Sequence, residues 1–137
     1  TGRGDFPNQV YNYVCFPSIL KGTLLVSSRK ITDTMAIKAA HSIAEFAENR
    51  GISIENIMPN MLEWELFPKV AADVAMQAIK EGVALKNLTW DEVYQEAKKD
   101  IIDTHEITQI LQDKEYIKPI TDEIVIEIMN KVIQKVQ

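Results

Sequence analysis

Two alanine-rich stretches constrain the fold of this chain more than any other feature of its sequence. The first recurs at the spacing of one helical face and consists of Ala36, Ala40, Ile43 and Ala47, joined by Ala39 and Phe46. The second is a narrower stripe made of Ala71, Val74, Ala75, Ala78 and Ile79. Small side chains let helices approach each other closely, so both stretches predict helices that pack tightly against neighbouring elements.

Capping signals frame both predicted helices. Thr32 is a candidate N-cap for the first, and Gly51 stands where a glycine commonly ends a helix. Pro68 suits the first position of the second helix, and Gly82 its end. The chain is therefore expected to be built around helices of defined length.

Four further helices are expected from similar signals. Pro17 is placed to open one of them. Thr89 and Glu92 have the spacing of a capping box at the start of another. A short separate helix is expected after Thr104, and Thr121 is the expected N-cap of the last helix.

The last predicted helix has an unusually wide apolar face. Its apolar side chains are Ile124, Val125, Ile126, Ile128, Met129, Val132, Ile133 and Val136. A helix on the surface of a monomer needs a narrower stripe than this. Such a helix either lies in a deep groove or contacts another chain, so a homodimer or a higher homo-oligomer is expected.

Strands have little support in the sequence. Residues 23–27 could form a short buried strand as a local alternative to the helix opened by Pro17. Residues 52–67 read as a short strand or extended segment followed by a turn. The predicted fold class is mainly α, with about five or six helices and one or two short strands.

Size and charge limit the classes of function. The 137 residues suffice for one domain, and the formal net charge of -5 disfavours nucleic-acid binding. No run of 18 apolar residues is present, so no membrane span is expected. A single cysteine cannot form an internal disulfide, which favours a reducing compartment such as the cytoplasm. The abrupt, loop-like start suggests a piece of a longer protein.

The first eighteen residues do not fit the helical pattern. They are rich in Gly, Pro and Asn, and they carry three amides at Asn8, Gln9 and Asn12. An amide offers both donors and an acceptor, so amides on an irregular loop suit the orientation of a polar ligand. A capped turn leading into a helix explains the same residues.

Other candidate sites have simpler structural explanations. The sequence contains no G-x-G-x-x-G fingerprint, Walker-type loop, C-x-x-C or H-E-x-x-H motif. A small buried thiol is expected at Cys15 rather than a nucleophile paired with His41, which is expected to be structural or exposed. His105 beside Asp103 and Glu106 is explained by solvated charge at a helix start rather than by a metal site.

Residues 2–17 read G-R-G-D-F-P-N-Q-V-Y-N-Y-V-C-F-P. This run resembles, without a gap, a segment of bacterial-type malic enzymes that reads G-R-S-D-Y-P-N-Q-V-N-N, three variable residues, then F-P-G. The resemblance continues at lower identity to about Leu85. It implies the C-terminal part of an α/β Rossmann-like NAD-binding domain over residues 1–85, followed by a C-terminal helical extension over residues 86–137.

The resemblance also implies an activity. Malic enzymes oxidise L-malate with NAD or NADP and decarboxylate the product to pyruvate and CO2. They use a Mg or Mn ion held by acidic residues, a Lys general base and a Tyr general acid. None of these motifs occurs in this chain, so no catalytic residue and no metal ligand is assigned to it. The piece alone is expected to be inactive, and the alternative is a non-catalytic helical interaction or oligomerisation module.

The register of the resemblance assigns candidate binding residues. Asn12 matches the second Asn of the family's N-N pair, which contacts malate beside the nicotinamide, so it is expected to bind substrate and cofactor. Tyr11 replaces the first Asn and is a weaker cofactor candidate. Asn8 matches the motif and is expected to shape the loop first and to contact the cofactor second. Ser18 replaces the Gly of F-P-G, which is expected to alter helix packing rather than chemistry.

Overall fold

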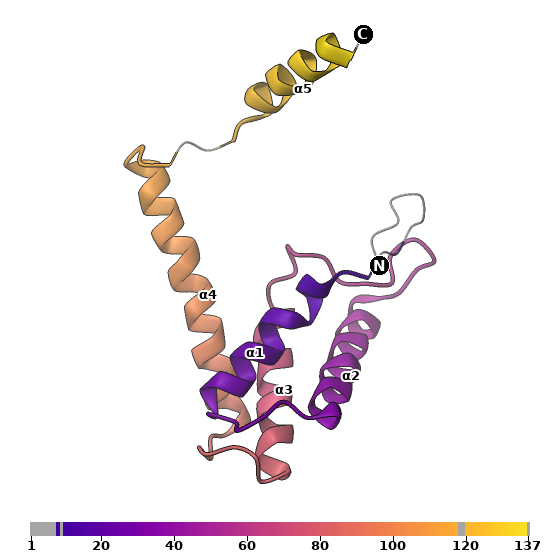
Figure 1. Cartoon of the computed structure of the whole chain (residues 1–137), viewed down its shortest axis with the longest axis vertical. Helices are drawn as coiled ribbons and strands as arrows, with labels where there is room; N and C mark the ends of the chain where they lie inside the picture. The colour runs from indigo at the N-terminus through magenta and orange to yellow at the C-terminus, as the bar shows by residue number, and fades with distance from the viewer. Residues whose placement is uncertain (1–7, 9, 118–119, 137) are drawn as a thin grey trace. The chain divides into compact units, whose positions relative to one another are not determined.

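The computed structural model describes residues 8, 10–117 and 120–136 (Figure 1). In this part of the chain, the helices are η1 (Asn12–Val14, a 3-10 helix), α1 (Phe16–Leu25), α2 (Asp33–Arg50), α3 (Leu66–Lys80), α4 (Trp90–Asp113) and α5 (Asp122–Val136). The same residues contain no strand, only an isolated bridge between Ser53 and Asn56. The predicted mainly helical fold is confirmed, and the predicted strands reduce to this bridge.

The chain divides into two compact units, Thr1–Ile101 and Ile102–Gln137. In the first unit, α3 packs against both α1 and α2. The start of α4 adds Val93 and Ala97 to the buried side chains of this unit. The second unit holds the rest of α4 together with α5, whose apolar side chains are exposed. None of the helices described is long and apolar enough to cross a membrane.

The small residues of α3 allow close contact, as the sequence predicts. Its residues 70–72, 74, 75 and 78 are all fully buried. A Cβ atom added to Gly22 of α1 would lie 2.2 Å from the carbonyl oxygen of Ala71. The two helices therefore cross where one of them has no side chain at all.

The buried face of α2 is rotated from the predicted stripe. Met35, Ala39 and Ile43 are buried, whereas Ala36 and Ala40 are exposed. An alanine costs little on either face, so its position alone does not fix the buried side. The larger Met35 and Ile43 side chains determine which face packs against α3.

The predicted caps at Thr32, at Gly51 and at Thr89 with Glu92 are confirmed. Thr32 Oγ1 accepts a hydrogen bond of 3.2 Å from the backbone N–H of Met35. The capping box closes in both directions, because the Thr89 N–H donates to Glu92 Oε2 at 2.7 Å and the Glu92 N–H donates to Thr89 Oγ1 at 3.2 Å. Gly51 follows α2 with a φ of 98°, a conformation that favours glycine.

Two predicted boundaries are wrong, and Pro17, expected to open its helix, is the second residue of α1. The helix expected after Thr104 is not separate, because α4 continues unbroken to Asp113 and Thr108 Oγ1 donates to the Thr104 carbonyl oxygen at 2.8 Å. No Gly or Pro interrupts this stretch, and a threonine can turn its hydroxyl back onto the preceding turn. Pro68 is the third residue of α3 rather than the first, which a proline also tolerates because the N–H groups of the first turn have no partner within the helix.

Candidate functional site

Asn12 lies at the junction between the N-terminal segment and α1. It begins η1, and its carbonyl oxygen accepts a 3.1 Å hydrogen bond from the N–H of Cys15. Val14, two positions on, is 2% exposed and anchors the segment in the core. The side chain of Asn12 itself is exposed. The core therefore fixes the backbone on which this amide is presented to solvent.

A shallow hollow of about 410 Å³ lies beside Asn12. It is lined by Asn12, Cys15, Phe16 and Ile19. Burial raises the pKa of the Cys15 thiol, which keeps this group in its neutral form. The hollow thus offers one neutral amide beside apolar walls, a combination that can orient a ligand through a few hydrogen bonds.

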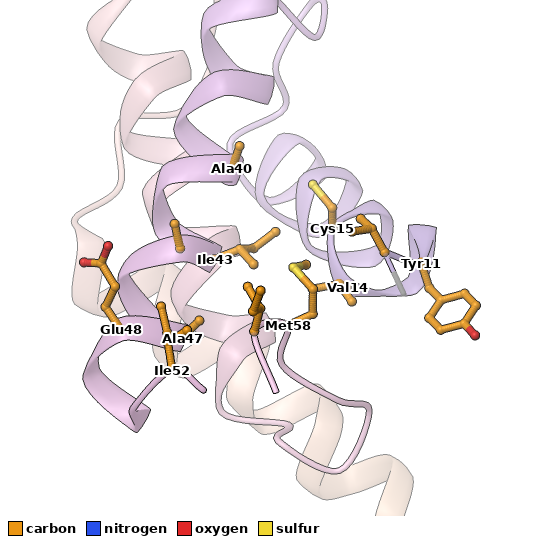
Figure 2. A pocket seen from close by; sticks show the side chains of 12 residues that line it. Tyr11, Val14, Cys15, Ala40, Ile43, Ala47, Glu48, Ile52 and Met58 are labelled. Atoms are coloured by element: carbon orange, nitrogen blue, oxygen red, sulfur yellow. The ribbon is translucent and has the colours of Figure 1, made fainter. Parts of the chain in front are cut away.

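Tyr11 is one of the residues that line a second cavity. This cavity, of about 370 Å³, lies between the segment, α2 and residues 52–58, and its lining is almost entirely apolar. Figure 2 shows Val14, Ile43 and Met58 directed toward one another, while the Tyr11 ring points away from them. That ring stacks on Tyr13 at a centroid distance of 5.5 Å.

Asn8 holds the N-terminal segment to a distant loop. Its Oδ1 accepts a 2.8 Å hydrogen bond from the N–H of Ile57, and its Nδ2 donates to the carbonyl oxygen of Ile54. The residue has a φ of 64°, a left-handed conformation that asparagine tolerates better than most residues. These contacts match the loop-shaping role expected of Asn8. Gln9 lies outside the described residues.

The structure also contains an anchor that the sequence does not indicate. The Arg50 guanidinium contacts the Glu63 carboxylate at 2.7 Å, the carbonyl oxygen of Asn56 at 3.1 Å and that of Met58 at 3.4 Å. An Arg and a Glu 13 positions apart across an irregular loop have no periodic signature. Nothing in the sequence pattern distinguishes Arg50 from an ordinary basic residue near the end of a helix.

The histidine, cysteine and acidic candidates were also compared with the requirements of a metal site. Among the residues that the structure describes, no group of three or more His, Cys, Asp or Glu side chains could hold a metal ion. His41 is exposed on α2, as expected, and His105 is exposed on α4. Asn12, beside the hollow described above, therefore remains the candidate to be tested.

Comparison with known proteins gives consistent matches. The family model described as "Malic enzyme, NAD binding domain" matches residues 1–83. The bifunctional malic/malolactic enzyme of Bacillus subtilis is 36% identical over 99 residues, which cover 72% of this chain and 24% of that protein. The NADP-dependent malic enzyme of Escherichia coli is 34% identical over 108 residues, covering 69% of this chain and 14% of that protein.

Solved structures agree with the sequence matches. The crystal structure of Entamoeba histolytica malic enzyme is 55% identical with a TM-score of 0.88, covering 99% of this chain and 28% of that one. The malic enzyme of Pyrococcus horikoshii is 37% identical with a TM-score of 0.75, covering 85% of this chain and 27% of that one. The chain thus spans about a quarter or less of the length of these four proteins. Since the NAD-binding-domain model also covers more than half of the chain, the resemblance seen in residues 2–17 is confirmed: this chain belongs to the malic enzyme family.

Proposed function

We propose that this chain is the C-terminal portion of a malic enzyme that converts L-malate and NAD or NADP to pyruvate, CO2 and the reduced cofactor. In this proposal residues 1–85 complete the NAD-binding domain and residues 86–137 form a helical extension. The observation that carries the proposal is the position of Asn12. The residue that matches the family's malate-contacting Asn is exposed beside a hollow with apolar walls, on backbone fixed by Val14.

The role proposed for Asn12 is positional. Its amide N–H groups can donate to a malate carboxylate and hold the C2–H bond of malate toward the nicotinamide ring. Correct orientation of two reactants contributes several kcal/mol to catalysis, on the order of 7 in favourable cases. Tyr11 and Asn8 remain weaker candidates for cofactor contact, since the Asn8 amide already bonds the backbone of Ile54 and Ile57.

The residues of this chain fit a nicotinamide cofactor better than they fit a Mg or Mn ion. An amide beside apolar walls suits a carboxamide or carboxylate group, so the Asn12 hollow fits part of a malate–nicotinamide pair. The family resemblance implies that the ligands of Mg or Mn lie upstream of this chain, and we adopt that location as part of the proposal. When bound, such an ion stabilises negative charge that develops on the substrate oxygen.

The complete protein provides the test. Incubated with L-malate, Mg or Mn, and either NAD or NADP, it is expected to form reduced nicotinamide and pyruvate in equal amounts. The isolated residues 1–137 are expected to form neither. Failure of the complete protein to reduce either cofactor with malate would contradict the proposal, as would an upstream sequence without a glycine fingerprint and acidic metal ligands.

A second candidate function is association, which the apolar surface of α5 favours. Its exposed side chains are Ile124, Val125, Ile126, Ile128, Met129, Val132 and Ile133. Exposed apolar surface of this extent commonly marks an interface. We propose that α5 packs against another copy of the chain or against another domain of the complete enzyme.

Sizing of the isolated chain tests this second candidate. Residues 1–137 are expected to elute above the monomer mass, whereas a chain that ends before Asp122 is expected to elute as a monomer. A variant with Lys131→Ala serves as the control, because this exposed residue pairs with Glu127 on the same helix. If residues 1–137 are monomeric and bind no apolar dye, an exposed association surface is ruled out.

A further inference from the structure

The loop that follows α2 is organised around one arginine side chain. Arg50 is the last residue of α2, and its guanidinium contacts Glu63, Asn56 and Met58, all within the segment of residues 51–63. Glu63 Oε1 also accepts a 2.8 Å hydrogen bond from the N–H of Asn60. The ion pair is partly sheltered, with both side chains 20% exposed. A planar guanidinium donates from separate nitrogen atoms in a fixed fork, whereas a lysine ammonium donates from a single nitrogen atom.

Little else holds this loop in place. Residues 51–57 are all exposed, and their only backbone ladder is the bridge between Ser53 and Asn56. Pro59 is buried and Met58 half-buried, so apolar contact anchors only the centre of the segment. A loop with so few buried apolar contacts has a low free energy of local opening. Its conformation therefore depends on polar contacts, those made by Arg50 and those made by Asn8.

The same loop supports the segment that carries Asn12. Asn8 bonds the backbone of Ile54 and Ile57, and both lie in the part of the loop that Arg50 encloses. Asn8 precedes Asn12 by four positions, and Val14 anchors the other side of Asn12 in the core. Asn12 thus lies between two anchored residues, Val14 in the core and Asn8 on the loop that Arg50 encloses.

We propose that Arg50 is a positioning residue for the malate site: it fixes residues 54–57, these fix Asn8, and Asn8 sets where the Asn12 amide lies. This inference rests on the proposed function. Arg50 itself makes no contact with substrate in this account. A small misplacement of an orienting group is costly in catalysis, so loss of Arg50 should affect turnover and malate affinity at a distance.

The test uses the complete enzyme with Arg50→Met, Asn8→Ala and the double variant. Each single variant is expected to lower kcat/KM for malate by about tenfold or more. Because both act through one chain of contacts, the double variant should be within about twofold of the worse single variant. Arg29→Met is the matched control, since Arg29 is exposed and lies outside this loop, and its kcat/KM should equal that of the wild type.

Arg50→Lys is measured in parallel, so that the result does not depend on the folding of Arg50→Met. Arg50→Lys retains the charge but not the contacts with three partners. We expect its kcat/KM for malate to lie between the values of the wild type and Arg50→Met. An unchanged kcat/KM in Arg50→Lys and Arg50→Met would overturn the inference. Losses that multiply in the double variant would also overturn it, because they would show independent structural damage.

Asn12→Ala separates failure of this inference from failure of the proposed function. If Asn12→Ala lowers kcat/KM while the Arg50 variants do not, only the positioning role of Arg50 is contradicted. If Asn12→Ala retains full activity, the malate site is misassigned, and the positioning role of Arg50 is contradicted as well.

Discussion

At the scale of single residues, Gly22 and Ser18 lie one turn apart on the buried side of α1. A Cβ on Gly22 would collide with the backbone oxygen of Ala71, which cannot move as a flexible side chain would. Gly22→Ala is therefore expected to lower the free energy of unfolding by about 1–3 kcal/mol, measured by urea unfolding. In an unconstrained helix the same change would stabilise by about 1 kcal/mol. A rise in stability would thus contradict the close crossing of α1 and α3.

Ser18→Ala provides the matched control on the same face. Ser18 is 1% exposed, and its hydroxyl has no hydrogen-bond partner among the described residues. Removal of a buried hydroxyl without a partner leaves no other group unsatisfied, so this change should be neutral or stabilising, by up to about 1 kcal/mol. The two substitutions are expected to change the free energy of unfolding in opposite directions. Gly22→Ala adds a carbon atom where there is no space, whereas Ser18→Ala removes a hydroxyl that makes no hydrogen bond.

At the scale of elements, a polar cluster fastens the start of α4 to α3. Asp73 is 9% exposed, and its carboxylate accepts hydrogen bonds from Trp90 Nε1 at 2.9 Å and from Lys69 Nζ at 3.0 Å. Burial alone would raise the pKa of Asp73, but the hydrogen bonds of Ser42, Trp90 and Lys69 outweigh it and lower this pKa. The ionised carboxylate is therefore the form that stabilises the fold.

The direction of this pKa shift predicts an effect of pH on stability. The contribution of Asp73 is fully present above its ordinary pKa and is lost as the pH falls through the lowered value in the folded protein. Urea unfolding between pH 6 and pH 2 should show a loss of stability below about pH 4 that is smaller in Asp73→Asn. Asn87→Ala, which removes an exposed amide that does not titrate, serves as control and should keep the wild-type slope. Identical slopes in wild type and Asp73→Asn would contradict this role.

Local signals predicted the elements well because helix ends depend on neighbouring residues. Thr32, and Thr89 with Glu92, were predicted as caps from spacing alone, and their hydrogen bonds are present. The buried face of α2 could not be predicted from its alanines, because the helix that packs against them decides which of them are buried. The unbroken course of α4 past Thr104 shows the same limit, since a threonine can cap a helix or lie within one.

At the scale of the whole molecule, the candidate site combines a local and a distant feature. Asn12 is a candidate from register against a family, because the motif is contiguous in sequence. The contact between Asn8 and Ile57 joins residues 49 positions apart and has no local signature. The Arg50 anchor is hidden for the same reason. The sequence therefore indicates the candidate amide, and the structure adds the contacts that Asn8 and Arg50 make.

The most direct test of this account is the steady-state rate of the complete enzyme with Asn12→Ala. Loss of one positioned hydrogen-bond donor at a reacting centre commonly lowers kcat by about a hundredfold, and we expect a loss of this size in malate-dependent reduction of NAD or NADP. Asn87→Ala, which removes an exposed amide between α3 and α4, should leave kcat unchanged. A kcat for Asn12→Ala within twofold of the wild type would contradict the assignment of this segment to the malate site.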